Sequence, residues 1–405
     1  MSNTILTPTA VSREAARILH QKLNFVGSCN KQYDDSFKDG GATVKGKFGP
    51  TLKIRMPNEY TVRSGLTMSA QDTSETSVDL TVSTVKGVDV SFTSTELALS
   101  LDDFSDRILM PAMSVLAANI EADALNMYKD VYNLYDGDAA AFAFGSLSGA
   151  RQILTDNLAP MDDSRCAILN TTHATKYMND TKGLFHDSSA IAKQYRDGMI
   201  GKTSGFGTIY ENTLLLPHAT GTAAKTTTYT VNGAVTTNGS TSVVVQTGTT
   251  TFKQGDVFTV AGCFRVHPET KVSTQVLQQF VVTADYAGGA GTLNFAPAIY
   301  TSGGRQNVVA AGMANSSAIV KVGAGASETL VQSLAFHKDA FAFVTADLPL
   351  PDGTDWAARQ VVDNISVSVV RDFSISDRSF PCRIDVLYGY KAIRPQLATR
   401  IHNDG

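Results

Sequence analysis

The stretch from Asp102 to Tyr135 constrains the fold of this chain more than any other segment. Its apolar residues recur at steps of three and four, and this spacing places them on one stripe of an α-helix. The stripe comprises Leu109, Met113, Leu116, Ile120, Ala124, Met127, Val131 and Leu134. The polar face carries Asn119, Glu121, Asp123, Asn126 and Lys129. The pattern predicts one long amphipathic helix with a continuous apolar face.

The sequence is compatible with two starting points for this helix. Pro111 lacks an N–H and fits a first turn, so that Met110 is a boundary and the helix covers about 25 residues, or roughly 37 Å. Alternatively the helix begins at Asp102 or Asp103, either of which can cap it, and kinks at Pro111. In both cases Asp136-Gly137 is the expected end.

Composition favours an ordered protein without a membrane or nucleic-acid signature. Of the 405 residues, 43% are hydrophobic and 18% are charged, which is enough for a substantial core. The net charge is −4, and no apolar run approaches the roughly 18 residues of a membrane span. Because the N-terminal residues lack the apolar block of a signal peptide, we expect synthesis and folding in the cytoplasm. The four cysteines are far apart and are predicted to be buried free thiols: Cys29, Cys166, Cys263 and Cys382.

The segments before the long helix are predicted to be one helix followed by extended chain. Residues 8–26 have a helical apolar face, and residues 52–57 alternate as in a strand. Residues 76–93 are predicted to form one or two long strands, with a turn or bulge near Lys86-Gly87. This region has little to bury within itself, so we expect an arm or loop that finds partners elsewhere.

After the long helix, helices and strands alternate in one compact unit. Helices are predicted at 148–158, 171–178 and 188–195, with strands at 165–170 and 206–216. From Glu328 the same character resumes, with a buried strand within 333–351 and two long antiparallel strands after residue 365.

Residues 217–326 differ from both flanks. They contain only nine charged side chains: Lys225, Lys253, Asp256, Arg265, Glu269, Lys271, Asp285, Arg305 and Lys321. Asn232-Gly233 and Asn238-Gly239 are strong hairpin signals. The strands predicted at 241–247, 255–262, 263–267, 275–286 and 291–299 suggest a small closed β-barrel, and residues 303–325 are predicted to be a loop. The chain therefore resembles a domain with an insertion.

No motif indicates catalysis. Residues 201–203 look like the end of a phosphate loop, but Arg196 stands where that motif needs a glycine, and the GGAG at 288–291 is predicted to be a turn. Cys263 and His267 are best explained as a packed pair. Adjacent carboxylates are explained as caps and solvated turns: Asp34-Asp35, Asp102-Asp103 and Asp162-Asp163. We predict no catalytic, cofactor or metal site, and no enzymatic activity.

Several segments, taken in order, resemble the major coat (capsid) proteins of short-tailed bacteriophages whose capsid subunit has an inserted domain. They are NTILTPTAVSREAARIL, NKQYDDSF, TLKIRMPNEYTVRSG, LAANIEADALN, YRDGMIGKTSGFGTIYENTLLLP, QGDVFTVAG and VLYGYKAIRP. The resemblance covers essentially the whole chain.

The resemblance implies an α+β fold, the tailed-phage capsid-subunit fold with an inserted small β-barrel. In this sequence the expected parts are an N-terminal arm (1–37), an extended loop (38–77), a peripheral domain with a spine helix at 102–135 (78–145), an axial domain in two parts (146–216 and 327–362), the inserted barrel (217–326), and peripheral-domain strands with the C-terminus (363–405). Charged loops of the insertion cross subunit boundaries in relatives, but the loops here are poor in charge. No covalent crosslinking is expected.

The implied function is a major capsid protein that self-assembles non-covalently into an icosahedral shell around the phage genome. Its implied partners are itself in hexamers and pentamers, a scaffolding protein and a portal during assembly, and packaged double-stranded DNA through non-specific contact, with no membrane. The implied location is the virion, after assembly in the host cytoplasm. The alternative is a virion decoration or attachment protein that binds cell-surface glycans. That alternative needs exposed aromatic platforms, whereas Tyr229, Phe252, Phe258 and Tyr286 are predicted to be core.

Overall fold

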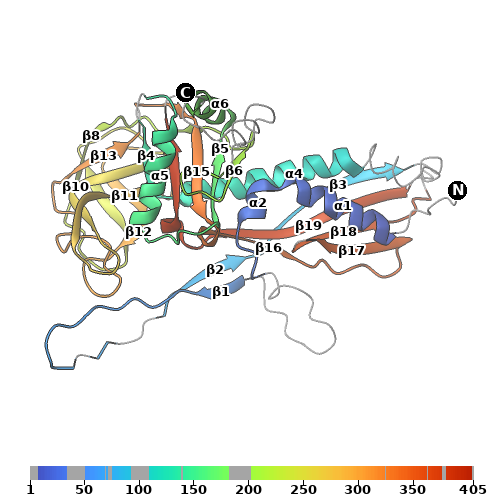
Figure 1. Ribbon diagram of the computed structural model, residues 1–405, viewed down its shortest axis with the longest axis horizontal. Helices are drawn as coiled ribbons and strands as arrows, with labels where there is room; N and C mark the ends of the chain where they lie inside the picture. The colour runs from blue at the N-terminus through green and yellow to red at the C-terminus, as the bar shows by residue number, and fades with distance from the viewer. Residues whose placement is uncertain are drawn as a thin grey trace. The chain divides into compact units, whose positions relative to one another are not determined.

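The chain forms two compact units in the computed structural model (Figure 1). The structure describes residues 8–33, 51–68, 70–71, 75–92, 109–137, 140–181, 202–323, 325–362, 364–375 and 380–403. The first unit comprises Met1–Arg55, Ser77–Asn126 and Phe341–Ile393, and the second comprises Met56–Thr76, Met127–Ala340 and Arg394–Gly405. No helix in the described ranges is long and apolar enough to cross a bilayer.

The N-terminal helix of the first unit is divided in two. Helix α1 spans Pro8–Lys22 and α2 spans Asn24–Ser28, and between them Leu23 is extended (φ −93°, ψ 94°). The predicted single helix over 8–26 is therefore wrong at this point. The extended Leu23 is buried, as is Phe25 in α2, so the apolar side chains at the break and in α2 both reach the core.

The spine helix is shorter than predicted. Helix α4 spans Met110–Leu125, with Pro111 in its first turn, while Leu109 also has helical dihedral angles. The alternative start at Asp102 or Asp103 lies outside the described residues. All eight residues of the predicted apolar stripe are buried.

The C-terminal end of the predicted helix has a different structure. A 3-10 helix follows at Asn126–Asp130, and strand β4 covers Leu134–Asp136. The predicted continuation to Tyr135 is wrong, because β4 pairs in parallel with a strand at the other end of the chain. The spacing of apolar residues within one segment cannot predict a pairing with a distant strand.

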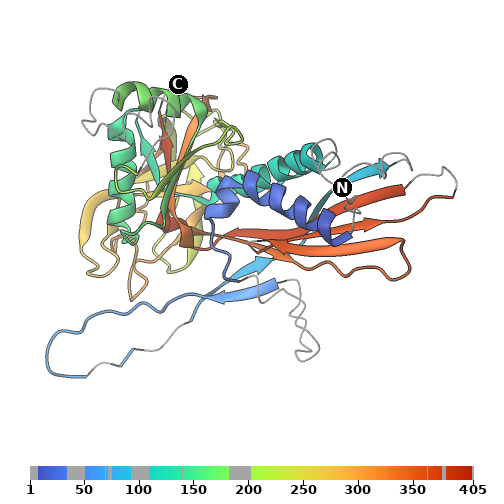
Figure 2. The same cartoon turned by 45° about the vertical axis from the view of Figure 1, so that its right-hand side comes forward.

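The first unit has an antiparallel sheet in the order β16-β19-β18-β17. Its strands are β16 (Phe341–Ala346), β17 (Trp356–Val362), β18 (Ile365–Arg371) and β19 (Phe380–Ala392), and β3 (Thr84–Phe92) pairs with β19 along its other edge. The two long antiparallel strands predicted after residue 365 are confirmed as β18 and β19. Helix α1 packs on β17 and β18 (Figures 1 and 2), whereas α4 packs against α1, α2 and β3.

A glycine predicted to mark a turn instead permits close packing. Strands β1 (Thr51–Arg55) and β2 (Ser77–Thr81) pair with each other, and the break before β3 falls at residues 82–83. The turn or bulge predicted at Lys86-Gly87 is therefore wrong. Gly87 lies inside β3 opposite Asp385, where a Cβ atom would come within 2.0 Å of the Asp385 Oδ1 atom.

The second unit is built on a five-stranded sheet in the order β4-β20-β15-β5-β6. Its other strands are β20 (Ala398–His402), β15 (Gln332–His337), β5 (Arg165–Leu169) and β6 (Thr208–Glu211). Helix α5 (Phe144–Asp156) packs on β20 and β4, and α6 (Thr171–Thr181) follows β5. The single buried strand predicted within 333–351 is two strands, β15 and β16, which belong to different sheets and are separated by a 3-10 turn at Lys338–Ala340. The predicted helix at 188–195 lies outside the described residues.

The second unit also contains the predicted small barrel, closed in the order β10-β11-β12-β9-β8-β13 (Figure 1). Its strands are β8 (Thr226–Val231), β9 (Ser240–Gln246), β10 (Val257–Val266), β11 (Ser273–Val282), β12 (Gly291–Ile299) and β13 (Ala318–Val322). Phe252, Phe258, Phe280 and Phe295 fill its interior. Gly233 and Gly239 have positive φ, as the hairpin signals predicted.

Two predictions within the barrel are wrong. Strand β13 lies in the predicted loop 303–325, and it closes the barrel by pairing with β8 and β10. Its alternate side chains Ile319 and Lys321 are buried, as in a strand with one face toward the interior. The strands predicted at 255–262 and 263–267 are one strand, β10, whose register with β11 shifts between Thr259 and Phe264. The chain reaches the barrel through β7 (His218–Ala219) and leaves it through β14 (Thr329–Leu330), and these two strands pair. The borders of the arm, loop and domains stay predictions.

Candidate functional site: the extended loop and the barrel junction

Residues 56–76, within the predicted extended loop (38–77), display large apolar side chains to solvent. Tyr60 is 56% exposed, Val62 94%, Leu66 101% and Met68 82%. The described part of this loop contains neither helix nor strand (Figure 2). Contiguous exposed apolar side chains mark sites where another protein binds. In the sequence these four residues stand at even positions, as in a strand that buries one face, so the pattern gives no sign of their exposure.

Hydrogen bonds across the loop hold its outer turn in one conformation. The Gln71 side chain accepts a bond from the Thr61 N–H (2.9 Å) and donates one to the Thr61 carbonyl oxygen (2.5 Å). Arg63 donates to the carbonyl oxygens of Gly65 and Thr67, and Gly65 supplies the positive φ that the turn requires. A loop ordered before binding loses less conformational entropy when a partner covers it.

The base of the loop contacts the turn between β12 and β13. Arg305 donates from Nη2 to the Thr76 hydroxyl (3.0 Å), and its guanidinium lies over the Tyr300 ring, 4.9 Å from the centroid. A Cβ atom on Gly304 would come within 2.2 Å of the Glu59 carbonyl oxygen, so this glycine allows the close approach. The loop and the barrel are thus joined within one unit.

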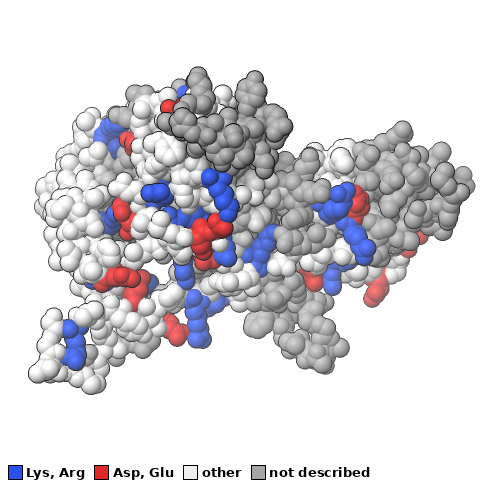
Figure 3. All heavy atoms as spheres, viewed as in Figure 1, with Lys and Arg blue, Asp and Glu red and all other residues white. Residues whose placement is uncertain are grey.

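The barrel surface carries few charges. On the face shown in Figure 3, Lys and Arg side chains are interspersed with Asp and Glu, and most of the described surface is uncharged. Exposed valines lie on β9, in the β10–β11 turn and on β11: Val244, Val272 and Val276. The described part of this face has no broad basic area of the kind that binds nucleic acid tightly.

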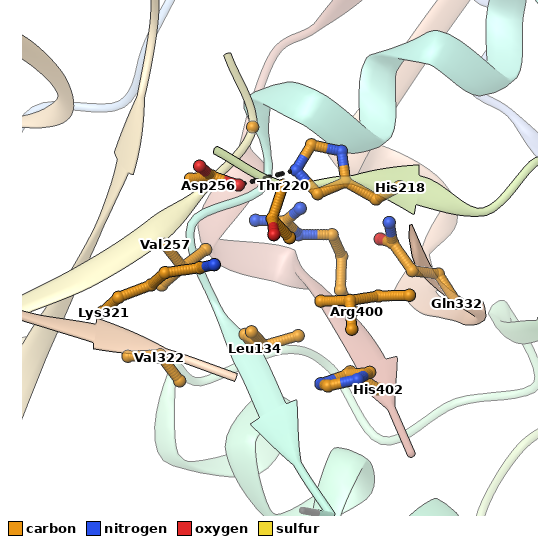
Figure 4. Close-up of a pocket in the computed structure, with 12 residues that line it drawn as sticks. Leu134, His218, Thr220, Asp256, Val257, Lys321, Val322, Gln332, Arg400 and His402 are labelled. Atoms are coloured by element: carbon orange, nitrogen blue, oxygen red, sulfur yellow. Dashed lines mark hydrogen bonds and ion pairs between the residues drawn. The ribbon is translucent and has the colours of Figure 1, made fainter. Parts of the chain in front are cut away.

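A buried polar cluster lies between the barrel and the five-stranded sheet (Figure 4). His218 contacts Asp256 Oδ1 through Nε2 (3.0 Å) and the Tyr128 hydroxyl through Nδ1 (3.1 Å). Burial lowers the pKa of His218 more than its bond to Asp256 raises it. The neutral ring therefore donates from Nε2 to Asp256 and accepts from Tyr128 at Nδ1.

The carboxylate of this cluster is structural. Burial alone would raise the pKa of Asp256, but hydrogen bonds from His218, the Lys253 N–H and the Gly221 N–H outweigh burial and lower it. The adjacent cavity has a volume of about 10 Å³, room for no more than about one water. A substrate cannot enter, so the Tyr–His–Asp arrangement ties strands together and does not act as a proton relay on a ligand.

The residues singled out in the sequence as possible chemistry are not brought together. Cys263 is buried in the barrel core, and the predicted thiols are all free and buried. Asp162, of the adjacent pair Asp162-Asp163, accepts from the Ser164 N–H in a turn, as predicted. The GGAG segment includes a turn with positive φ at Gly288 and Gly289. Asp34-Asp35 and Asp102-Asp103 lie outside the described residues. Within the described ranges no group of three or more His, Cys, Asp or Glu side chains is placed to hold a metal.

Another buried histidine should make the protein sensitive to acid. His173 in α6 is fully buried, contacts the Ser333 hydroxyl through Nδ1 (2.8 Å) and stacks on Phe142 (4.6 Å between centroids). Burial lowers its pKa to about 4. The unfolded chain protonates His173 more readily than the folded chain does. The stability that the neutral His173 contributes is therefore fully present above about pH 6.5 and is lost as pH falls toward 4.

We expect His173→Gln to remove this pH dependence, because glutamine keeps a polar side chain but does not titrate. Between pH 7 and 4 the wild type should lose about 3 kcal/mol more free energy of unfolding than the variant, and urea unfolding at each pH measures the difference. Parallel curves for the two proteins would contradict the assignment to His173.

Comparison with known proteins decides the family. A family model described as P22 coat protein, gene protein 5, matches residues 46–400. The chain belongs to the P22 coat protein family. The resemblance found in the sequence is thereby confirmed, and this coat protein is a major capsid protein that forms the phage shell by association with copies of itself. The family is one of structural capsid proteins.

Several solved structures are similar to this coat protein. A structure titled Mycobacterium phage Che8 is 16% identical, covers 94% of this chain and 90% of its own, and has a TM-score of 0.48. The mature capsid of bacteriophage PhiM1 is 11% identical over 88% and 83% of the two chains, with a TM-score of 0.43. The CUS-3 coat protein I-domain is 26% identical over 23% of this chain and 94% of its own, with a TM-score of 0.18. No curated protein sequence matches the chain.

Proposed function

We propose that the extended loop (residues 38–77) joins neighbouring subunits of the shell by lying over the peripheral domain of an adjacent coat protein. The observation that carries the proposal is the near-complete exposure of Val62, Leu66 and Met68 on a turn that its own hydrogen bonds hold in place. The N-terminal arm has the same role, and the inserted barrel lies on the outer surface of the shell.

The energy of such a contact is modest for one subunit and large for a shell. Burying one large apolar side chain contributes about 1.5–3 kcal/mol. Every subunit repeats the contact, so each added subunit is held by several loops at once, and the contacts reinforce one another through multivalency. This is how a shell becomes stable without covalent links.

The remaining partners follow from the same function. A scaffolding protein and a portal take part in assembly in the host cytoplasm, and packaged DNA meets the inner surface without sequence readout. The mild net charge of −4 supports a shell that does not hold DNA tightly. The glycan-binding alternative receives no support from its candidate aromatic residues, because Tyr229, Phe252 and Phe258 are buried in the barrel core and Tyr286 packs against it.

The direct test is particle size. The chain, expressed alone or with a scaffolding partner, should give shells or large polyhedral particles by negative-stain electron microscopy. Discrete small oligomers under all assembly conditions would count against a shell built by these contacts.

A further inference from the structure

The cavity between the barrel and the sheet contains donors for which the described residues supply no acceptor. Gln332 of β15 and Arg400 of β20 both line it, and they are 3% and 2% exposed. No hydrogen-bond partner of Arg400 Nε or Nη2, or of either amide atom of Gln332, exists among the described residues. A buried donor without an acceptor costs about 1–3 kcal/mol, and more if it is charged.

Strand register places these groups on one face. Gln332 pairs with His402, and Leu334 pairs with Arg400, so all four side chains project from the same side of the sheet. Gln332 and Arg400 are diagonal neighbours, a separation that long side chains span. Figure 4 shows Arg400 between Lys321 and Gln332.

The unpaired atoms of Arg400 form one edge of its guanidinium. Nε and Nη2 point in the same direction, and this edge is the one that arginine uses to hold an acceptor with two N–H groups. The guanidinium also lies 5.9 Å from the centroid of the Tyr128 ring. Burial lowers the pKa of Arg400 to about 10, so it remains charged at neutral pH.

The charges that line the cavity do not balance. Lys321 and Arg400 contribute two positive charges, and Asp256 is the one acidic residue among the described residues of the lining. Asp256 already accepts from His218, Gly221 and Lys253. Lys321 Nζ donates to the Ala223 and Gly325 carbonyl oxygens, which are neutral.

The next carboxylate is engaged elsewhere. Asp136 lies 3.6 Å from Lys225 Nζ and 3.6 Å from His402 Nδ1, and it accepts from the Gly323 N–H. One positive charge of the cavity lining therefore has no negative charge to balance it. The guanidinium edge of Arg400 and the amide of Gln332 border a space of about 10 Å³. A polyatomic ligand such as phosphate does not fit this space.

We propose that this cavity binds one small monatomic anion of the chloride class, held by Arg400 and Gln332 between the inserted barrel and the sheet. Lys321 belongs to the barrel strand β13, whereas Arg400 and Gln332 belong to the sheet. The anion ties the barrel to the sheet electrostatically. The inference concerns the subunit itself and does not depend on how subunits assemble.

The test is the dependence of stability on the anion. We expect the unfolding equilibrium constant of the unassembled full-length chain to fall about tenfold for each tenfold rise in chloride above its dissociation constant, as for one bound ion. Bromide should act like chloride, and gluconate, which is too large for the cavity, should give no such dependence. Urea unfolding at matched ionic strength, with sodium gluconate replaced stepwise by sodium chloride, measures it.

Two variants at the site and one control locate the effect. Arg400→Met should lose the chloride dependence. Gln332→Glu should also lose it, without a lower stability in gluconate, because the new carboxylate takes the place of the anion beside Arg400; this variant decides the question if Arg400→Met does not fold. Lys202→Met removes an exposed cation that does not line the cavity and should keep the full chloride dependence.

Two results would overturn the proposal. Equal stability of the wild type in chloride and gluconate would mean that the cavity holds water only. A chloride dependence that persists in Gln332→Glu would mean that the anion binds at another place.

Discussion

A double variant in the extended loop, Leu66→Asp with Met68→Asp, should abolish shell formation and leave the subunit folded. Both side chains are almost fully exposed, and they contribute little to the stability of the free subunit. Surface changes of this kind alter the free energy of unfolding by about 0.5 kcal/mol or less. At an interface the same two positions would lose about 3–6 kcal/mol of apolar burial, before the cost of burying two carboxylates.

The expected size of the effect on assembly is large. Since about 1.4 kcal/mol corresponds to a factor of ten, the protein concentration at which shells appear should rise by about 10²–10⁴-fold. Light scattering across a concentration series measures this threshold, and urea unfolding measures subunit stability in parallel. Ser64→Asp is the matched control, because it adds a charge to the same exposed turn without removing an apolar side chain. Normal shells from the double variant would show that the loop is not an assembly contact.

The parts of the fold that the sequence predicts are those set by local pattern. The stripe from Leu109 to Ile120 is helical because its spacing matches the helical repeat, and each of its members is buried. The barrel was predictable because Asn-Gly turns and short apolar strands both signal hairpins over a few residues. Such signals need no knowledge of what the segment packs against.

The errors occur where a distant partner decides the local structure. Leu134 continues the helical stripe, yet it lies in a strand because β20 is available to pair with it. Strand β13 has only five residues between glycine-rich segments, and only the open edges of β8 and β10 reveal its role. The same limit applies to the functional site. The apolar residues of the loop are visible in the sequence, but their exposure and the contact of Arg305 with Thr76 are not.

The polar face of α4 contains the most consequential of these errors. The sequence pattern places Glu121 on the polar face of the helix, yet Glu121 is 1% exposed within the subunit. Its Oε1 accepts from the Phe25 N–H (2.6 Å) and its Oε2 from the Val26 N–H (3.2 Å). Both N–H groups are in the first turn of α2, where helix amides have no partner within the helix and where negative charge is favoured. The carboxylate thus fixes α2 on the spine helix.

Glu121→Ala should therefore destabilise the first unit strongly, by about 3–5 kcal/mol, because two buried N–H groups lose this acceptor and a cavity replaces the side chain. Glu121→Gln should cost about half as much, since its single amide oxygen still accepts one bond. Asn119→Ala, an exposed change two residues earlier on the same helix, should cost about 0.5 kcal/mol or less.

Hydrogen exchange separates this effect from general loss of structure. In Glu121→Ala the amides of Phe25 and Val26 should exchange much faster than in the wild type, while amides of the β10–β11 pair in the barrel keep their protection. Unchanged protection at Phe25 and Val26 would show that the carboxylate does not cap α2. Faster exchange would also explain why the helix is divided at Leu23. The chain leaves the helical path at that residue, and the first N–H groups of α2 then donate to a buried acceptor on α4.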